Sequence, residues 1–138
     1  MTTATAEKPA EATPNTPFYK LGGQPVFDAI VNRFYDLMEQ DPAYGELRAM
    51  HAPDLAKMRV SLAGFLAGWA GGPRTWFEEN PGKCMMSAHK PFVITGQTAG
   101  QWADAMHRAI ADVAPADGDL AKAMAGVLAD MAKGMARD

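Results

Sequence analysis

The stretch PVFDAIVNRFYDLM, residues 25–38, places large apolar side chains three and four positions apart, at Phe27, Ile30, Val31, Phe34 and Met38. This spacing is the period of one face of an α-helix. Pro25 suits the first helical turn, where a missing backbone N–H costs nothing. The pattern predicts a helix of about 15 residues that stops near Asp41 and Pro42.

Three further segments of the chain have the same period. Asp54 and Thr98 are suited to cap the second and third helices, because their side-chain oxygens can accept a backbone N–H. Residues 71–73 (Gly-Gly-Pro) end the second helix, and Pro115 with Gly118 breaks the third. The apolar stripes are Leu55, Met58, Leu62, Phe65, Leu66 and Trp69, then Trp102, Met106, Ala109, Ile110 and Val113, then Leu120, Met124, Val127, Leu128, Met131 and Met135. Four amphipathic helices without sustained strand-like alternation predict an all-α domain.

The bulk composition indicates an ordinary soluble protein. The 138 residues are 48% hydrophobic and 21% charged, with a formal net charge of -3, so the chain lacks the basic character of nucleic-acid binders. Residues 1–17 hold almost no large apolar side chain, so we expect a loose tail before one domain at residues 18–138. No secretory signal and no apolar run of about 18 residues is seen, which favours a cytoplasmic protein without a membrane span.

One histidine stands in an apolar setting, in CMMSAHKPF at residues 84–92. By itself His89 is best interpreted as a buried histidine that bonds a backbone carbonyl. Tyr35, His51 and Trp102 also fall on or beside the apolar stripes, and each has an equally ordinary structural interpretation. His107 lies about 140° around its helix from Trp102 and is predicted to face solvent. A single histidine among apolar helices also suits haem, which takes one proximal imidazole.

Six short motifs together resemble the truncated haemoglobins, and within them the second group. They occur in the same order between about Phe18 and Ala114, and they are YKLGG (19–23), RFYDLM (33–38), RAMHAPDL (48–55), FLAGWAGGP (65–73), AHKPFVI (88–94) and QWADAMHRAI (101–110). The resemblance implies a two-over-two helical sandwich around haem b.

The resemblance also implies roles for individual residues. His89 is expected to be the proximal iron ligand, with Tyr35, His51 and Trp102 on the distal side. A phenol O–H and an indole N–H stabilise negative charge on a ligand in a low-dielectric pocket, so oxygen and related diatomic molecules are the expected ligands. The same donors suit peroxidase or nitric oxide dioxygenase chemistry served by a separate reductase. A haem-based sensor or redox partner, and a haemless helical binding module, are the alternatives.

The sequence departs from the family pattern at several positions. Met58 and Leu62 are expected to face the ligand from the second helix, and Met58 could narrow access or serve as a sixth ligand, as could Tyr35 or His51. Ser61 replaces a common lysine, which leaves Arg59, Lys83 and Lys90 as candidates to pair with the haem propionates. Weaker haem retention would follow from that loss. The expected haem-pocket walls are Phe34, Phe65, Met85, Phe92 and Ile94. Oligomeric state and the role of lone Cys84 are left open.

Overall fold

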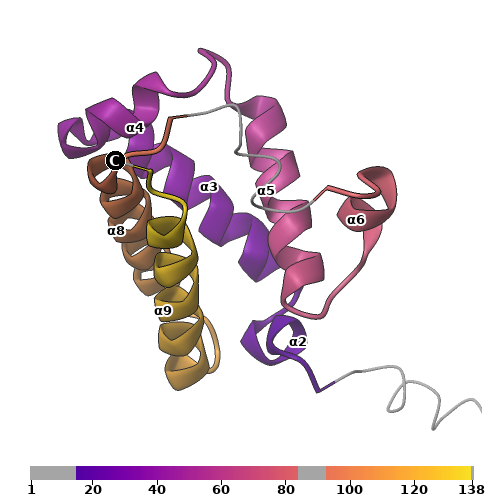
Figure 1. The fold of residues 1–138 in the computed structure, drawn as a ribbon. Coiled ribbons are helices and arrows are strands. Elements are labelled where there is room, and N and C mark those ends of the chain that lie inside the picture. Colours follow the sequence, from indigo (N-terminus) through magenta and orange to yellow (C-terminus); the bar gives the residue numbers. More distant parts are fainter. Residues whose placement is uncertain (1–14, 84–92, 138) are drawn as a thin grey trace, which may run out of the picture.

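The computed structural model describes residues 15–83 and 93–137, and within them it is all-α (Figure 1). The elements are α2 (Pro17–Leu21), α3 (Gln24–Gln40), the 3₁₀ turn η1 (Pro42–Tyr44), α4 (Gly45–Ala49), α5 (Ala56–Trp69), α6 (Thr75–Glu79), α8 (Gly96–Val113) and α9 (Gly118–Gly134). The four long helices α3, α5, α8 and α9 match the four predicted ones. None of the helices in the described ranges is long and apolar enough to cross a bilayer.

The long helices pack as two pairs, α3 with α5 and α8 with α9 (Figure 1). Helix α9 returns antiparallel to α8, so its last turn lies beside the start of α8. A backbone hydrogen bond of 2.8 Å from the Arg137 amide to the Ile94 carbonyl closes this end. The expected two-over-two sandwich is confirmed, and its core is built from the apolar stripe of α3 together with Leu66, Met106, Ile110 and Leu128.

Helix α2 fastens the N-terminal side of the fold to the end of α5. The Thr16 hydroxyl donates to the Gly71 carbonyl at 3.1 Å, and the Phe18 amide donates to the Ala70 carbonyl at 3.0 Å. Gly71 has a φ of 95° and leaves no room for a Cβ beside Thr16. The folded unit therefore includes Thr16 and Pro17, which lie before the expected boundary at Phe18.

Two helix caps differ from the prediction by a few residues. Thr95, not Thr98, is the N-cap of α8: its hydroxyl accepts the Thr98 amide while the Thr98 hydroxyl accepts the Thr95 amide, a reciprocal capping box. Leu55 holds the N-cap position of α5, although the Asp54 carboxylate still accepts the Ala56 amide at 2.9 Å. Both hydroxyl groups of a Thr-x-x-Thr sequence can cap, so the sequence alone did not say which begins the helix.

The buried face of α9 is narrower than the predicted apolar stripe, which included Val127. Val127 is 49% exposed, because Met124 and Leu128 face α8 and the neighbouring position turns outward. The side chains of Ala121 and Ala125 are buried instead, and their small size lets α9 approach α8 closely.

Candidate functional site

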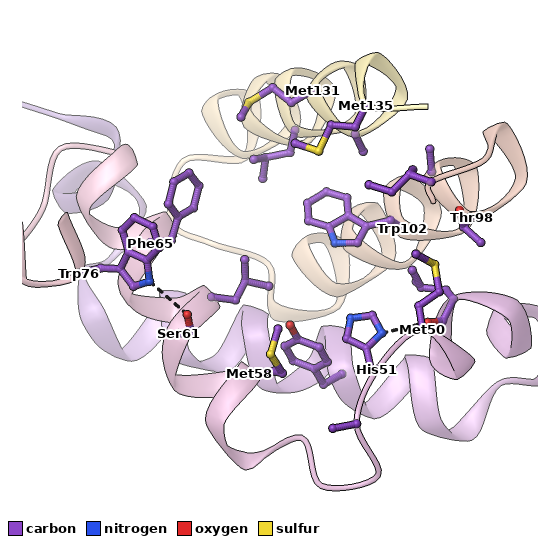
Figure 2. Close-up of a pocket in the computed structure, with 18 residues that line it drawn as sticks. Met50, His51, Met58, Ser61, Phe65, Trp76, Thr98, Trp102, Met131 and Met135 are labelled. Carbon is purple, nitrogen blue, oxygen red and sulfur yellow. Dashed lines mark hydrogen bonds between the residues drawn. The ribbon is translucent and has the colours of Figure 1, made fainter. Parts of the chain in front are cut away.

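A cavity of about 530 Å³ opens between the two helix pairs (Figure 2). Its size lies within the range of about 300–1,000 Å³ that is typical of cofactor and small-molecule sites. The lining is mostly apolar and, among the described residues, includes no lysine, arginine or carboxylate. It consists of Tyr35, Leu47, Met50, His51, Ala52, Met58, Ser61, Leu62, Phe65, Trp76, Ile94, Thr98, Ala99, Trp102, Leu128, Met131, Ala132 and Met135.

Tyr35 brings a buried phenol to the cavity from α3. Its side chain is only 2% exposed, and no hydrogen bond to its hydroxyl is found within the described residues. Burial raises the pKa of Tyr35 to about 12, and the positive charge of Arg59 partly opposes that rise. The phenol therefore keeps its proton at neutral pH and presents a hydrogen-bond donor.

Trp102 brings an indole to the same cavity from α8 (Figure 2). In the part of the chain that the structure describes, no acceptor lies at hydrogen-bond distance from its N–H. Phe34 fixes the two donor rings relative to one another, since its own ring packs edge-on against Tyr35 at 4.9 Å and against Trp102 at 5.3 Å between centroids. The cavity thus presents two pre-positioned donors that are available to a bound molecule as far as the described residues show.

His51 is oriented by the backbone of α4. Its Nδ1 lies 2.9 Å from the Leu47 carbonyl oxygen, which can only accept, so Nδ1 carries the proton when the ring is neutral. The other ring nitrogen faces the cavity (Figure 2). Helix α4 is itself held on α8 by Gln101, whose side chain accepts the Leu47 amide at 3.0 Å and donates to Glu46 at 2.8 Å.

The predicted apolar lining is only partly recovered. Met58, Leu62, Phe65 and Ile94 line the cavity as expected. Phe34 does not: it is fully buried behind Tyr35 and Trp102, because its position on α3 faces α8 rather than the cavity. Met85 and Phe92 lie outside the described residues.

The predicted propionate partners are not found at the cavity. Arg59 points away from it toward α3, where Asp36 accepts from the guanidinium at 2.9 Å, Glu39 at 3.4 Å and the Asn32 carbonyl at 3.0 Å. Carboxylates on α3 therefore hold the Arg59 side chain, and its expected pairing with a haem propionate stays a prediction. Lys83 is exposed and does not line the cavity. Lys90 lies outside the described residues.

Sequence reasoning missed two polar lining residues, Ser61 and Trp76. The Trp76 indole donates to the Ser61 hydroxyl at 3.1 Å and stands at the opposite end of the cavity from His51 (Figure 2). Trp76 belongs to α6, a five-residue helix too short to show a helical period. The available signal was the pair Gly64 and Gly68 on α5. Because these residues have no Cβ atom, Trp76 and Phe77 of α6 can pack against α5.

Comparison with known proteins agrees with this architecture. The family model described as bacterial-like globin matches residues 16–137. The chain belongs to the bacterial-like globin family. A group 1 truncated haemoglobin of Chlamydomonas moewusii is 32% identical over 127 residues, which cover 91% of this chain and 71% of that protein.

Solved structures of similar proteins extend the comparison. The cold-adapted truncated haemoglobin of Pseudoalteromonas haloplanktis superposes with a TM-score of 0.85 at 29% identity and covers 90% of this chain and 99% of its own. The group II truncated haemoglobin of Bacillus anthracis has a TM-score of 0.79 at 27% identity, with 90% and 98% covered. Membership of a globin family implies a haem cofactor and haem-based binding of gaseous ligands.

The cavity of this bacterial-like globin fits such a cofactor. An apolar lining suits a flat aromatic macrocycle, and the thioethers of Met50, Met58, Met131 and Met135 can adapt to its faces. The unsatisfied donors of Tyr35 and Trp102 suit a polar ligand beside it. His89, the predicted proximal ligand, lies outside the described residues, in the segment between α6 and α8.

Proposed function

We propose that this chain binds haem b in the cavity and thereby binds oxygen and related diatomic ligands. The observation that carries the proposal is the pair of donors, the Tyr35 O–H and the Trp102 N–H, which line an apolar cavity and find no acceptor among the described residues. Haem, when bound, supplies an iron centre that takes up diatomic ligands.

Tyr35 and Trp102 would hold the diatomic ligand by donating hydrogen bonds to it. Because the lining is apolar, little solvent competes for these bonds, and each is stronger than it would be in water. Tyr35 stays protonated at neutral pH, and the Trp102 indole can only donate. Slow release of the ligand is the expected consequence.

His89 is the proposed proximal iron ligand, on the basis of the family resemblance. A neutral imidazole would bind iron through one ring nitrogen and donate from the other to a backbone carbonyl. The other two histidines have different places: His107 is exposed on α8, and His51 is held by the Leu47 carbonyl on the distal side. We propose a five-coordinate iron that can become six-coordinate reversibly.

We also place the chain in the second group of truncated haemoglobins. The Bacillus anthracis comparison and the Tyr35–Trp102 pair support this, whereas the Chlamydomonas moewusii relative is named group 1. A separate reductase and redox chemistry on nitric oxide or peroxide complete the proposal and follow from the resemblance alone. A cytoplasmic location is proposed from the sequence, in which no secretory signal and no long apolar run is seen.

One spectroscopic comparison tests the proposal. Purified chain reconstituted with haem is expected to show a sharp Soret band, and His89→Ala is expected to abolish or strongly shift that band. His107→Ala, at an exposed position of α8, is the matched control and should leave the spectrum unchanged. An unchanged spectrum in His89→Ala would refute the proximal assignment, and the absence of any Soret band in the parent would refute haem binding.

A further inference from the structure

Arg59 occupies an unusual place beside the cavity. It follows Met58 on α5, yet its guanidinium turns toward α3 and contacts Asn32, Asp36 and Glu39. Its side chain is only 24% exposed. Three acceptors on successive turns of α3 therefore fix the position of one positive charge.

That charge lies against the buried Tyr35. The central guanidinium carbon is 5.8 Å from the centroid of the Tyr35 ring. Two other rings lie nearby: the His51 ring stands edge-on to Tyr35 at 6.0 Å, and the uncharged Trp102 of α8 packs against Phe34, which contacts Tyr35. Asp36 and Glu39 approach from α3 itself but are engaged by Arg59.

We propose that Arg59 is a positioning residue for the distal tyrosine: its charge, held over the Tyr35 ring by α3, polarises the phenol O–H and strengthens the hydrogen bond donated into the cavity. This inference rests on the proposed function of Tyr35. A positive charge favours electron density on the phenol oxygen and so makes its proton a better donor. The direction agrees with the pKa of Tyr35, which burial raises and Arg59 lowers.

The type of residue matters for this role. Arginine presents several N–H donors in a planar fork, so it can contact Asn32, Asp36 and Glu39 together and remain over the ring. Lysine keeps the charge but cannot make all of these contacts. The substitutions Arg59→Gln and Arg59→Lys therefore separate the charge from the geometry.

The test follows the titration of Tyr35 directly. The full chain is labelled with ring-fluorinated tyrosine, which lowers every phenol pKa into a convenient range, and fluorine NMR resolves the three tyrosines. Tyr→Phe variants assign the signals. Arg33→Gln is the matched control, because Arg33 also pairs α3 with another helix, through Asp112 at 2.8 Å, but no contact joins it to the Tyr35 ring.

In Arg59→Gln, the Tyr35 signal is expected to titrate roughly half a pKa unit or more above the parent. Arg59→Lys should retain most of the parent value, and Arg33→Gln all of it. The Tyr44 signal should not move in any variant, which also reports that the fold is intact. The inference is overturned if Tyr35 titrates in Arg59→Gln as in the parent, or if Arg59→Lys shifts it as far as Arg59→Gln does.

Ligand release provides the second readout. Oxygen is expected to dissociate roughly twofold faster from Arg59→Gln than from Arg59→Lys or Arg33→Gln, because a weaker donor holds it. If Arg59→Gln shifts the Tyr35 titration but leaves the oxygen dissociation rate unchanged, the role of Arg59 is overturned. The role of Tyr35 is tested separately by Tyr35→Phe. Unchanged dissociation in Tyr35→Phe itself would instead refute the proposed role of Tyr35 as a donor to the ligand.

Discussion

At the scale of single residues, the cavity is marked by two donors, the Tyr35 hydroxyl and the Trp102 indole, that have no acceptor among residues 15–83 and 93–137. A buried hydroxyl without a partner costs free energy, so Tyr35 is retained at a cost to stability that a bound ligand offsets. The Trp102 indole likewise has no acceptor among the described residues, but it is only partly buried. Phe34 lies between the two rings and keeps them apart at a fixed angle.

Removing either donor should speed release of the ligand. Tyr35→Phe and Trp102→Phe are each expected to raise the oxygen dissociation rate roughly two- to tenfold, the value of one hydrogen bond. Stopped-flow displacement measures the rate. Tyr19→Phe is the control, since Tyr19 is exposed and remote from the lining. If neither distal variant releases oxygen faster than this control, the hydrogen-bonding argument is wrong.

Tyr35 should also make stability depend on alkaline pH. Its folded pKa of about 12 lies above the ordinary value of 10.0, so the folded state binds the proton more tightly than the unfolded chain does. The resulting stabilisation is complete below about pH 10 and is lost as the pH rises toward 12, on the order of 2 kcal/mol. Urea unfolding at several pH values should show a shallower alkaline decline in Tyr35→Phe than in Tyr19→Phe. An identical decline in both variants would contradict this.

Methionines report the accessibility of the lining. Met58 is 39% exposed at the cavity, whereas Met38 and Met106 are each 1% exposed in the core. Because thioether oxidation follows exposure, dilute peroxide should convert Met58 to its sulfoxide well before the two core methionines. Peptide mass spectrometry over a time course measures the order. Equal oxidation rates at Met58, Met38 and Met106 would contradict the expected order.

At the scale of elements, α6 depends on two missing side chains of α5. A Cβ on Gly68 would lie 2.6 Å from the Phe77 ring and 3.0 Å from the Pro73 carbonyl oxygen, and one on Gly64 would lie 3.3 Å from Trp76. These glycines let α6 press its aromatic side chains against Phe65, whose ring is 5.2 Å from that of Trp76. One end of the cavity is built from this contact.

Alanine at Gly68 should therefore be harmful, although alanine is normally the better helix former. We expect Gly68→Ala to lower the free energy of unfolding by about 1–3 kcal/mol, because Phe77 and the Pro73 backbone must move. Gly126→Ala is the control: Gly126 is an exposed position within α9 with open space around it, and the change should raise stability by about 0.5–1 kcal/mol. If chemical denaturation gives the same change in the free energy of unfolding for Gly68→Ala and Gly126→Ala, α6 can move away from α5 at little cost.

The elements also show what a sequence can and cannot predict. Periodic stripes identified the four long helices, whereas the grouping of Tyr35, His51, Met58 and Trp102 was implied by the family resemblance. The structure brings all four side chains to the lining of one cavity. The contacts of Arg59 with α3 were not predicted, since its partners lie 20 to 27 positions away in sequence. Trp76 was missed because a contact through glycines leaves no periodic signal.

At the scale of the whole molecule, the site belongs to no single element. Its lining comes from α3, α4, α5, α6, α8 and α9, and polar contacts tie these helices together at its edge. Arg108 on α8 pairs with Asp41 at 2.8 Å and donates to the Tyr44 hydroxyl at 2.9 Å, which fixes η1 and thereby the start of α4. The Ala43 amide and the Arg108 guanidinium hold the pKa of the Asp41 carboxyl below its usual value.

Because every long helix contributes to the lining, filling the cavity should stabilise the entire fold. Chain reconstituted with haem is expected to unfold at a clearly higher temperature than the chain without it, with loss of helix and loss of the Soret band coinciding. Circular dichroism and absorbance melts on the same sample measure both. If helix is lost at the same temperature with and without haem, the conclusion that all long helices contribute to one haem site is contradicted.

The antiparallel return of α9 has a consequence for biosynthesis. Along the chain, the lining begins with Tyr35 on α3 and includes Met131 and Ala132 in the last turns of α9 and Met135 at its C-cap. While the ribosome still holds those residues, α3, α5 and α8 can pack, but one wall of the site does not yet exist. Cofactor capture thus has to wait until α9 has left the ribosome, and until then the apolar lining is exposed to chaperones or to aggregation.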